Sequence, residues 1–87
     1  MKREPKKDRT DLFLRAFGQV VQERRKDLHL SQEELADRAE LHRTYIGDIE
    51  RGVRNVALRN VYRLAQALDT SPGDLMSETD RKVEKGR

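Results

Sequence analysis

Residues 30–52 decide the fold, and they read LSQEELADRAELHRTYIGDIERG. The stretch opens with a capping box, in which the Ser31 hydroxyl accepts from the Glu34 amide and the Glu34 side chain reaches back. This predicts a helix with the inner face Leu35, Ala36 and Ala39. After a short break at residues 40–42, a second helix over about 43–50 buries Ile46 and Ile49, and Gly52 ends it. Two helices joined so tightly favour a helix-turn-helix, and a generic small helical bundle is the alternative.

The flanking sequence carries three more helix signals. Apolar spacing predicts helices over about 12–26 and 57–68, the second with Leu58, Val61, Ala65 and Leu68 at helical spacing. Ser71 and Pro72 open a fifth helix as a side-chain cap followed by proline, and this helix closes near Met76 or a turn later. We therefore expect an all-α, compact five-helix domain over residues 12–76. A flexible basic arm (1–11) precedes it, and a charged tail or helix extension (77–87) follows it.

The composition excludes several classes of protein. The chain has 87 residues, no Cys and two His, which leaves room for one small domain and argues against disulfides and metal sites. We expect no cofactor and no enzymatic activity, because no nucleophile cluster or phosphate-binding glycine loop accompanies the histidines. No apolar run approaches the length of a membrane helix or signal sequence, so we expect a soluble cytoplasmic protein. The net charge of +3 hints at a polyanionic partner.

The motif residues quoted above closely resemble the Xre/Cro (lambda-repressor-like) helix-turn-helix family of transcriptional regulators. Arg25, seven residues before Gln32, and the apolar positions of the last two predicted helices extend the resemblance over about residues 20–76. The second motif helix starts at Arg43 and ends at Gly52 with residues that look most like those of regulators associated with restriction–modification systems, phage and plasmids. Glu40 departs from the family's glycine, and we expect the turn backbone to shift rather than adopt positive φ. His42 is a poorer cap, and Asn55 substitutes for a missing cap before the fourth helix.

The resemblance implies sequence-specific binding of double-stranded DNA, with the second motif helix in the major groove. We expect base reading by His42, Arg43, Thr44, Gly47 and Asp48. Arg43 leads because its guanidinium matches the O6 and N7 acceptors of guanine. Asp48 accepts from cytosine N4 or holds Arg43 in place, and a solvated Arg43–Asp48 surface pair is the alternative. We expect phosphate contacts from Gln32, Tyr45, Arg51, Arg54, Asn55 and Arg59. The resemblance also implies a structural salt bridge between Arg25 and Glu50.

One such domain reads few base pairs, so we expect a homodimer on a near-palindromic operator with half-sites about 34 Å apart. The candidate dimer residues are Tyr62, Leu64 and Met76, and the alternative is that they complete the domain's own core. A protein-interaction module with the same fold, such as an antitoxin or a bridging coactivator with a protein partner, is the second functional hypothesis.

Charge is distributed unevenly. Residues 31–52 hold three arginines against six acidic residues, whereas residues 1–30 hold nine basic residues against five acidic ones. The motif is therefore not a basic patch, and phosphate attraction depends on a few placed groups. Basic residues of the arm could follow the DNA backbone, although a solvated end is the alternative: Lys2, Arg3, Lys6, Lys7 and Arg9. We expect the acidic residues of the first motif helix to face solvent or a partner protein.

Overall fold

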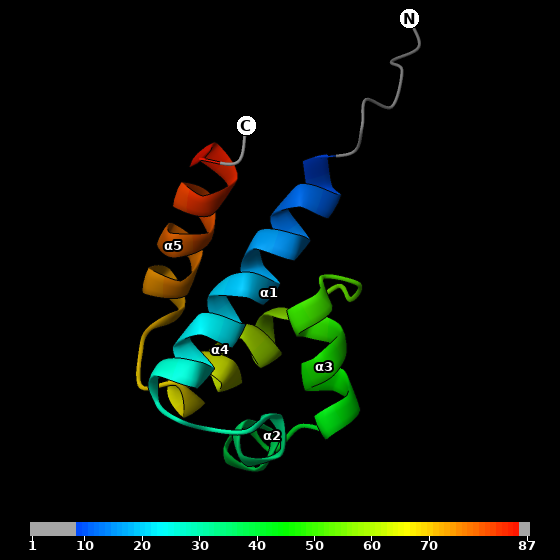
Figure 1. The fold of residues 1–87 in the computed structure, drawn as a ribbon, viewed down its shortest axis with the longest axis vertical. Coiled ribbons are helices and arrows are strands. Elements are labelled where there is room, and N and C mark those ends of the chain that lie inside the picture. The colour runs from blue at the N-terminus through cyan, green and yellow to red at the C-terminus, as the bar shows by residue number, and fades with distance from the viewer. Residues whose placement is uncertain (1–8, 86–87) are drawn as a thin grey trace, which may run out of the picture.

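A computed structural model describes residues 9–85 as five α-helices, and this part of the chain contains no strand. The helices are α1 (Arg9–Asp27), α2 (Gln32–Ala39), α3 (Arg43–Arg51), α4 (Leu58–Ala67) and α5 (Pro72–Lys85). Helix α5 lies beside α1, α3 packs against α1 and α2, and α2 and α4 close the far end of the domain (Figure 1). The all-α, five-helix prediction is confirmed. No described helix is both long and apolar enough to cross a membrane.

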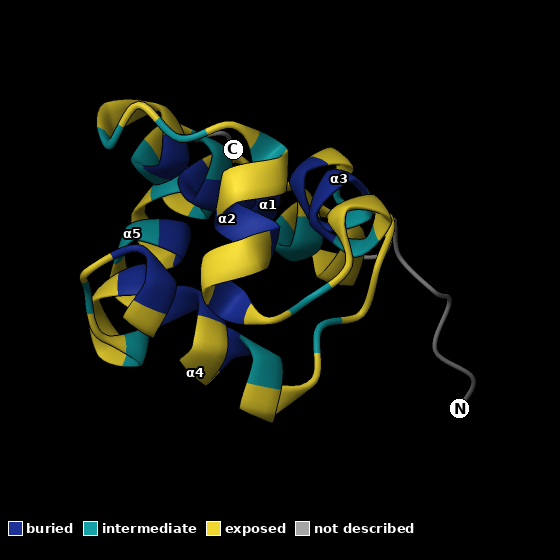
Figure 2. Cartoon of the chain, turned by 90° about the horizontal axis from the view of Figure 1, so that it is seen from below, coloured by how far each residue is buried: buried dark blue, intermediate teal, exposed yellow. Residues whose placement is uncertain are grey.

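All five helices contribute to one core. Its largest fully buried apolar side chains are Val20, Val21, Leu35, Ile46, Ile49, Leu64, Leu68 and Leu75. Figure 2 shows helices with buried residues turned inward and exposed residues outside. Burying each such side chain contributes on the order of 1.5–3 kcal/mol, which is how short helices are held together here. The apolar spacing of the sequence therefore predicted the inner faces of α2, α3 and most of α4.

Two helices are longer than the sequence predicted. Helix α1 begins at Arg9, so residues 9–11 form helix rather than part of the flexible arm, and the rest of the arm lies outside the described residues. Helix α5 continues to Lys85, so residues 77–85 form the helix extension and not the tail, the two alternatives that the sequence left open. Polar contacts with α1 stabilise it, since Glu78 pairs with Arg24 and Lys82 pairs with Glu23, and the buried Thr79 hydroxyl is satisfied by donating to the Leu75 carbonyl at 2.7 Å. An apolar pattern could not reveal such contacts.

The turns differ from the predictions at two positions. Glu40 ends α2 with φ 58° and ψ 44°, so the expected shift of the backbone away from positive φ is wrong. Ala57, not Asn55, caps α4, and it has no side-chain hydrogen bond to the helix. His42 likewise caps α3 without a side-chain hydrogen bond, as predicted. The capping box of α2 is confirmed, since the Ser31 hydroxyl accepts from the Glu34 amide at 2.9 Å.

Candidate nucleic-acid interface

Helix α3 is held against α1 by two glycines. A Cβ at Gly18 would overlap the carbonyl oxygen of Ile49 and lie 2.8 Å from that of Glu50. Gly52 ends α3 with φ 75°, and a Cβ there would lie 2.7 Å from the Cα of Arg15. The two helices therefore touch backbone to backbone at the C-terminal end of α3. Because this contact leaves no room for adjustment, the direction of α3 is set by the body of the domain.

A buried ionic network fixes α3 further. Arg25 and Glu50 are each 8% exposed, and the Arg25 Nε and Nη2 atoms donate to the Glu50 carboxylate at 2.7 and 3.0 Å. Arg25 Nη1 also donates to the Leu30 carbonyl at 2.8 Å. The hydrogen bond with Glu50 raises the pKa of Arg25 above its usual value. The predicted structural salt bridge is thus present, and it joins α1, α3 and the loop before α2.

Gln32 belongs to the same network. Its Nε2 donates to Glu50 Oε1 at 3.0 Å, which orients the amide at the N-terminus of α2. The second N–H of this amide and the first backbone amides of α2 are suited to an anion. The predicted phosphate position is therefore held in place by the residue pair that also fixes α3.

The first turn of α3 presents its side chains outward. His42, Arg43 and Thr44 are exposed, and the Arg43 side chain forms no ion pair or hydrogen bond with any part of residues 9–85. A free, exposed guanidinium on a rigid helix can bond an external acceptor pair without breaking an internal contact. Gly47, another predicted base-reading position, is buried; a Cβ there would lie 3.7 Å from Gln32 Oε1.

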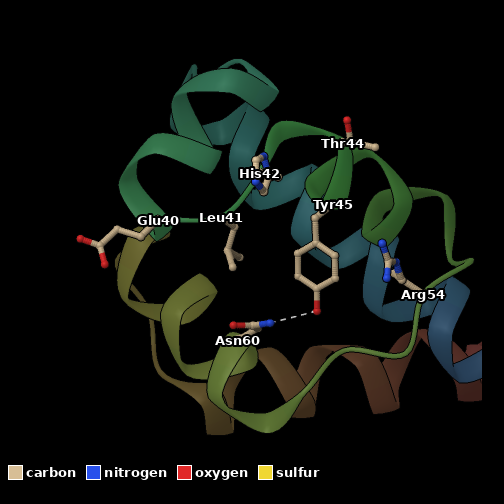
Figure 3. Close-up of a pocket in the computed structure, with 7 residues that line it drawn as sticks. All are labelled: Glu40, Leu41, His42, Thr44, Tyr45, Arg54 and Asn60. Carbon is tan, nitrogen blue, oxygen red and sulfur yellow. Dashed lines mark hydrogen bonds between the residues drawn. The ribbon is translucent and has the colours of Figure 1, made fainter.

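Beside this turn lies an open hollow of about 650 Å³ between the α2–α3 turn, α3 and the start of α4. Its lining residues are Glu40, Leu41, His42, Thr44, Tyr45, Arg54 and Asn60 (Figure 3). The Tyr45 ring is half-buried, its hydroxyl accepts from Asn60 Nδ2 at 3.1 Å, and the Arg54 guanidinium lies 5.0 Å from the ring centroid. The sequence analysis missed Asn60, and no local signal distinguishes it from other helical asparagines.

The remaining predicted phosphate residues lie between the last residue of α3 and the first turn of α4, and all of them are exposed: Arg51, Arg54, Asn55 and Arg59. Asp48 pairs with two of these arginines, through its Oδ1 atom with Arg51 and through Oδ2 with Arg54 Nε at 3.5 Å. The predicted contact between Asp48 and Arg43 is therefore wrong. Arg51, three residues after Asp48, lies one helical turn away, whereas a residue five positions back does not share that face.

The predicted dimer residues fall into three different environments. Leu64 is 0% exposed and belongs to the core, so its assignment to a dimer surface is wrong. Its place between Val61 and Ala65 on the inner stripe of α4 already indicated this. Met76 is half-buried against the core, whereas Tyr62 is 56% exposed. One turn before Tyr62, Leu58 is 82% exposed, although the sequence analysis grouped it with the inner stripe of α4.

Comparison with known proteins relates the chain to DNA-binding regulators. A helix-turn-helix family model matches residues 21–75. Control protein C.BamHI of Bacillus amyloliquefaciens is 50% identical over 64 residues, covering 72% of this chain and 79% of that protein. The crystal structure of the restriction–modification controller protein C.AhdI from Aeromonas hydrophila matches with a TM-score of 0.70 and 50% identity, over 71% of this chain and 94% of that one. The controller protein C.Esp1396I, solved as a tetramer with its natural 35-base-pair operator, matches with a TM-score of 0.75 and 27% identity, over 82% and 93% of the two chains.

Proposed function

The chain belongs to the helix-turn-helix family, and from this membership we propose that it is a control protein of a restriction–modification system. It regulates transcription by binding operator DNA as a homodimer, with α3 in the major groove. The observation that carries the proposal is the combination of a rigidly seated α3 with an exposed Arg43 side chain at its start that has no partner within residues 9–85. The similarity to C.BamHI and C.AhdI supports the assignment to the controller type.

Base reading falls to the first turn of α3. Arg43 donates two parallel hydrogen bonds to the O6 and N7 atoms of a guanine. Such a bidentate contact favours guanine over the wrong base by about 1–3 kcal/mol. Thr44 and His42, exposed beside it, contact neighbouring base edges or a thymine methyl group. Because Gly18 and the Arg25–Glu50 pair hold α3 from behind, these side chains meet the groove at a set angle.

Phosphate contacts flank this turn on two sides. On one side, Gln32 and the first amides of α2 bind a phosphate, with the Gln32 amide oriented by Glu50. On the other side, phosphates are bound by Arg54 of the α3–α4 loop and by the exposed arginines at the adjoining helix ends, Arg51 and Arg59. Tyr45 contributes indirectly, because its ring supports Arg54 and its hydroxyl is engaged by Asn60.

The homodimer forms through the exposed apolar side chains near the start of α4. Leu58 and Tyr62 lie one turn apart on the same helix face, and Val53 of the preceding loop is 65% exposed. Covering such large, exposed apolar side chains with a second copy of the protein is favourable, because it removes their apolar surface from water. A two-fold pair joined here has α3 on both sides of the axis, which suits a near-palindromic operator.

The DNA-binding test uses a duplex from upstream of the protein's own gene and an unrelated duplex, at several salt concentrations. We expect the upstream fragment to be retained at moderate salt. Arg43→Ala should reduce selectivity, and Gln32→Ala should weaken binding to both duplexes. Arg81→Ala, an exposed arginine of α5, is the matched control that leaves both unchanged. If no upstream fragment is retained, the protein-interaction module replaces the regulator as the best reading.

The dimer test measures molecular mass by sedimentation equilibrium. Leu58→Ser should shift the protein toward monomer while its Tm stays close to that of the parent, because Leu58 makes little contact with the core. Leu12→Ser, at a partly exposed position of α1, is the control and should leave the dimer intact. An unchanged dimer in the Leu58 variant would place the interface elsewhere on the domain.

A further inference from the structure

Asp48 neutralises two of the arginines that the proposed function assigns to DNA phosphates. It lies on α3, and its side chain is 21% exposed. Its two carboxylate oxygens pair separately with Arg51 and Arg54, whose side chains are 65% and 48% exposed. Arg54 is also held over the Tyr45 ring. In the free protein, therefore, these two exposed cations share one carboxylate.

These pairs are weak enough to exchange. An ion pair between exposed side chains contributes little, since water and salt screen it. A DNA phosphate can therefore take over either arginine. Each exchange, however, takes one of its two partners from the Asp48 carboxylate, on the same helix that enters a strongly negative groove.

Every base pair places one amino donor in the major groove, but on only one of its two bases, so Asp48 finds a replacement partner only where the base that it faces carries the donor. Cytosine presents its N4 amino group and adenine its N6 amino group as hydrogen-bond donors, whereas the groove edges of guanine and thymine present acceptors. Asp48 follows the exposed Thr44 by four residues on α3, so it lies on the same helix face as Thr44, one turn further along the groove. A carboxylate released from its arginines is stabilised opposite an amino group and repelled opposite an acceptor.

We propose that Asp48 couples base reading to phosphate binding. On the operator, the amino group of a base donates a hydrogen bond to the Asp48 carboxylate, and Arg51 and Arg54 bind the DNA phosphates instead of Asp48. On unrelated DNA, the base that faces Asp48 is often a guanine or a thymine, whose acceptors repel the carboxylate, so the arginines stay paired with Asp48 and fewer phosphate contacts form. Asp48 is thereby a specificity-determining residue that acts by lowering the affinity for non-operator DNA. This inference rests on the proposed function.

The test compares Asp48→Asn with Asp37→Asn. Both variants add one unit of positive charge, but Asp37 is an exposed residue of α2 with no arginine partner in the described part of the chain. Dissociation constants are measured for the operator and for an unrelated duplex across a salt series. Each phosphate contact contributes about 0.9 to the slope of log affinity against log salt concentration. At about 0.15 M salt, one contact therefore strengthens binding about fivefold relative to about 1 M salt.

We expect Asp48→Asn to bind the unrelated duplex at least about fivefold more tightly than Asp37→Asn does, with a steeper salt slope, and to bind the operator no more tightly. Adding Arg51→Ala and Arg54→Ala should remove the difference between the two variants. Equal operator-to-unrelated ratios in Asp48→Asn and Asp37→Asn would overturn the inference, provided that the parent binds its operator. A parent that binds no operator would instead contradict the proposed function.

Discussion

The Arg25–Glu50 pair offers the sharpest test of how the domain positions α3. Replacing Arg25 with Ala removes three hydrogen bonds, two to Glu50 at 2.7 and 3.0 Å and one to the Leu30 carbonyl at 2.8 Å. Glu50, 8% exposed, then keeps only its glutamine donors, Gln32 at 3.0 Å and Gln22 at 3.5 Å. Leaving one buried charge without its partner costs about 3–5 kcal/mol.

For a domain of this size, about 3 kcal/mol lowers Tm by roughly 12–24 °C. Thermal unfolding followed by circular dichroism measures this, alongside operator affinity. We expect Arg25→Ala to lose both stability and binding, and Arg25→Lys to lose less, because it keeps the charge. Arg43→Ala should lose binding alone, since its side chain has no internal partner within residues 9–85. A Tm for Arg25→Ala equal to that of the parent would refute the structural role of the pair.

Three further predictions concern stability, and thermal melts check each of them. Glu40→Gly should raise stability by about 1 kcal/mol, because glycine adopts the observed φ of 58° without steric cost. Gly18→Ala should destabilise the domain by at least about 1–3 kcal/mol, the range for an overpacked core, since its Cβ would meet the Ile49 carbonyl; an unchanged Tm would contradict the close helix contact. The hydrogen bond from Arg24 lowers the pKa of Glu78, so this pair stabilises the fold at neutral pH and loses its effect as the pH falls through that lowered pKa. The Tm advantage over Glu78→Gln should therefore shrink in acid, below about pH 4.3.

Apolar periodicity and capping residues were sufficient to predict the five helices and most of the core. The Ser31–Glu34 box and the Gly52 terminus are local signals, because the hydrogen bonds that they describe join residues a few positions apart. The Arg25–Glu50 pair came from the family resemblance, and no spacing rule would have joined residues 25 positions apart in the chain.

The errors share a physical origin in tertiary contacts. Helix α5 was expected to end near Met76 or a turn later, with a tail or a helix extension after it, and the structure has the extension, in which Glu78 and Lys82 form ion pairs with α1. Leu58 fits the apolar stripe of α4 by spacing and yet points outward, because it stands at the first position of the helix, beyond the reach of the core. Asp48 pairs with Arg51 as its i,i+3 neighbour on α3, which helical spacing allows, whereas its pair with Arg54 depends on how the chain runs after Gly52, a geometry that no pattern in the sequence reports.

Selection from a random pool of duplexes tests the central claim most directly, namely that two copies of α3 read DNA through Arg43. The account predicts one enriched motif made of two inverted half-sites with centres about 34 Å apart. Each half-site should contain a guanine whose preference disappears when the selection is repeated with Arg43→Ala. Enrichment of no symmetric motif, or the same guanine preference in the variant, would contradict the account.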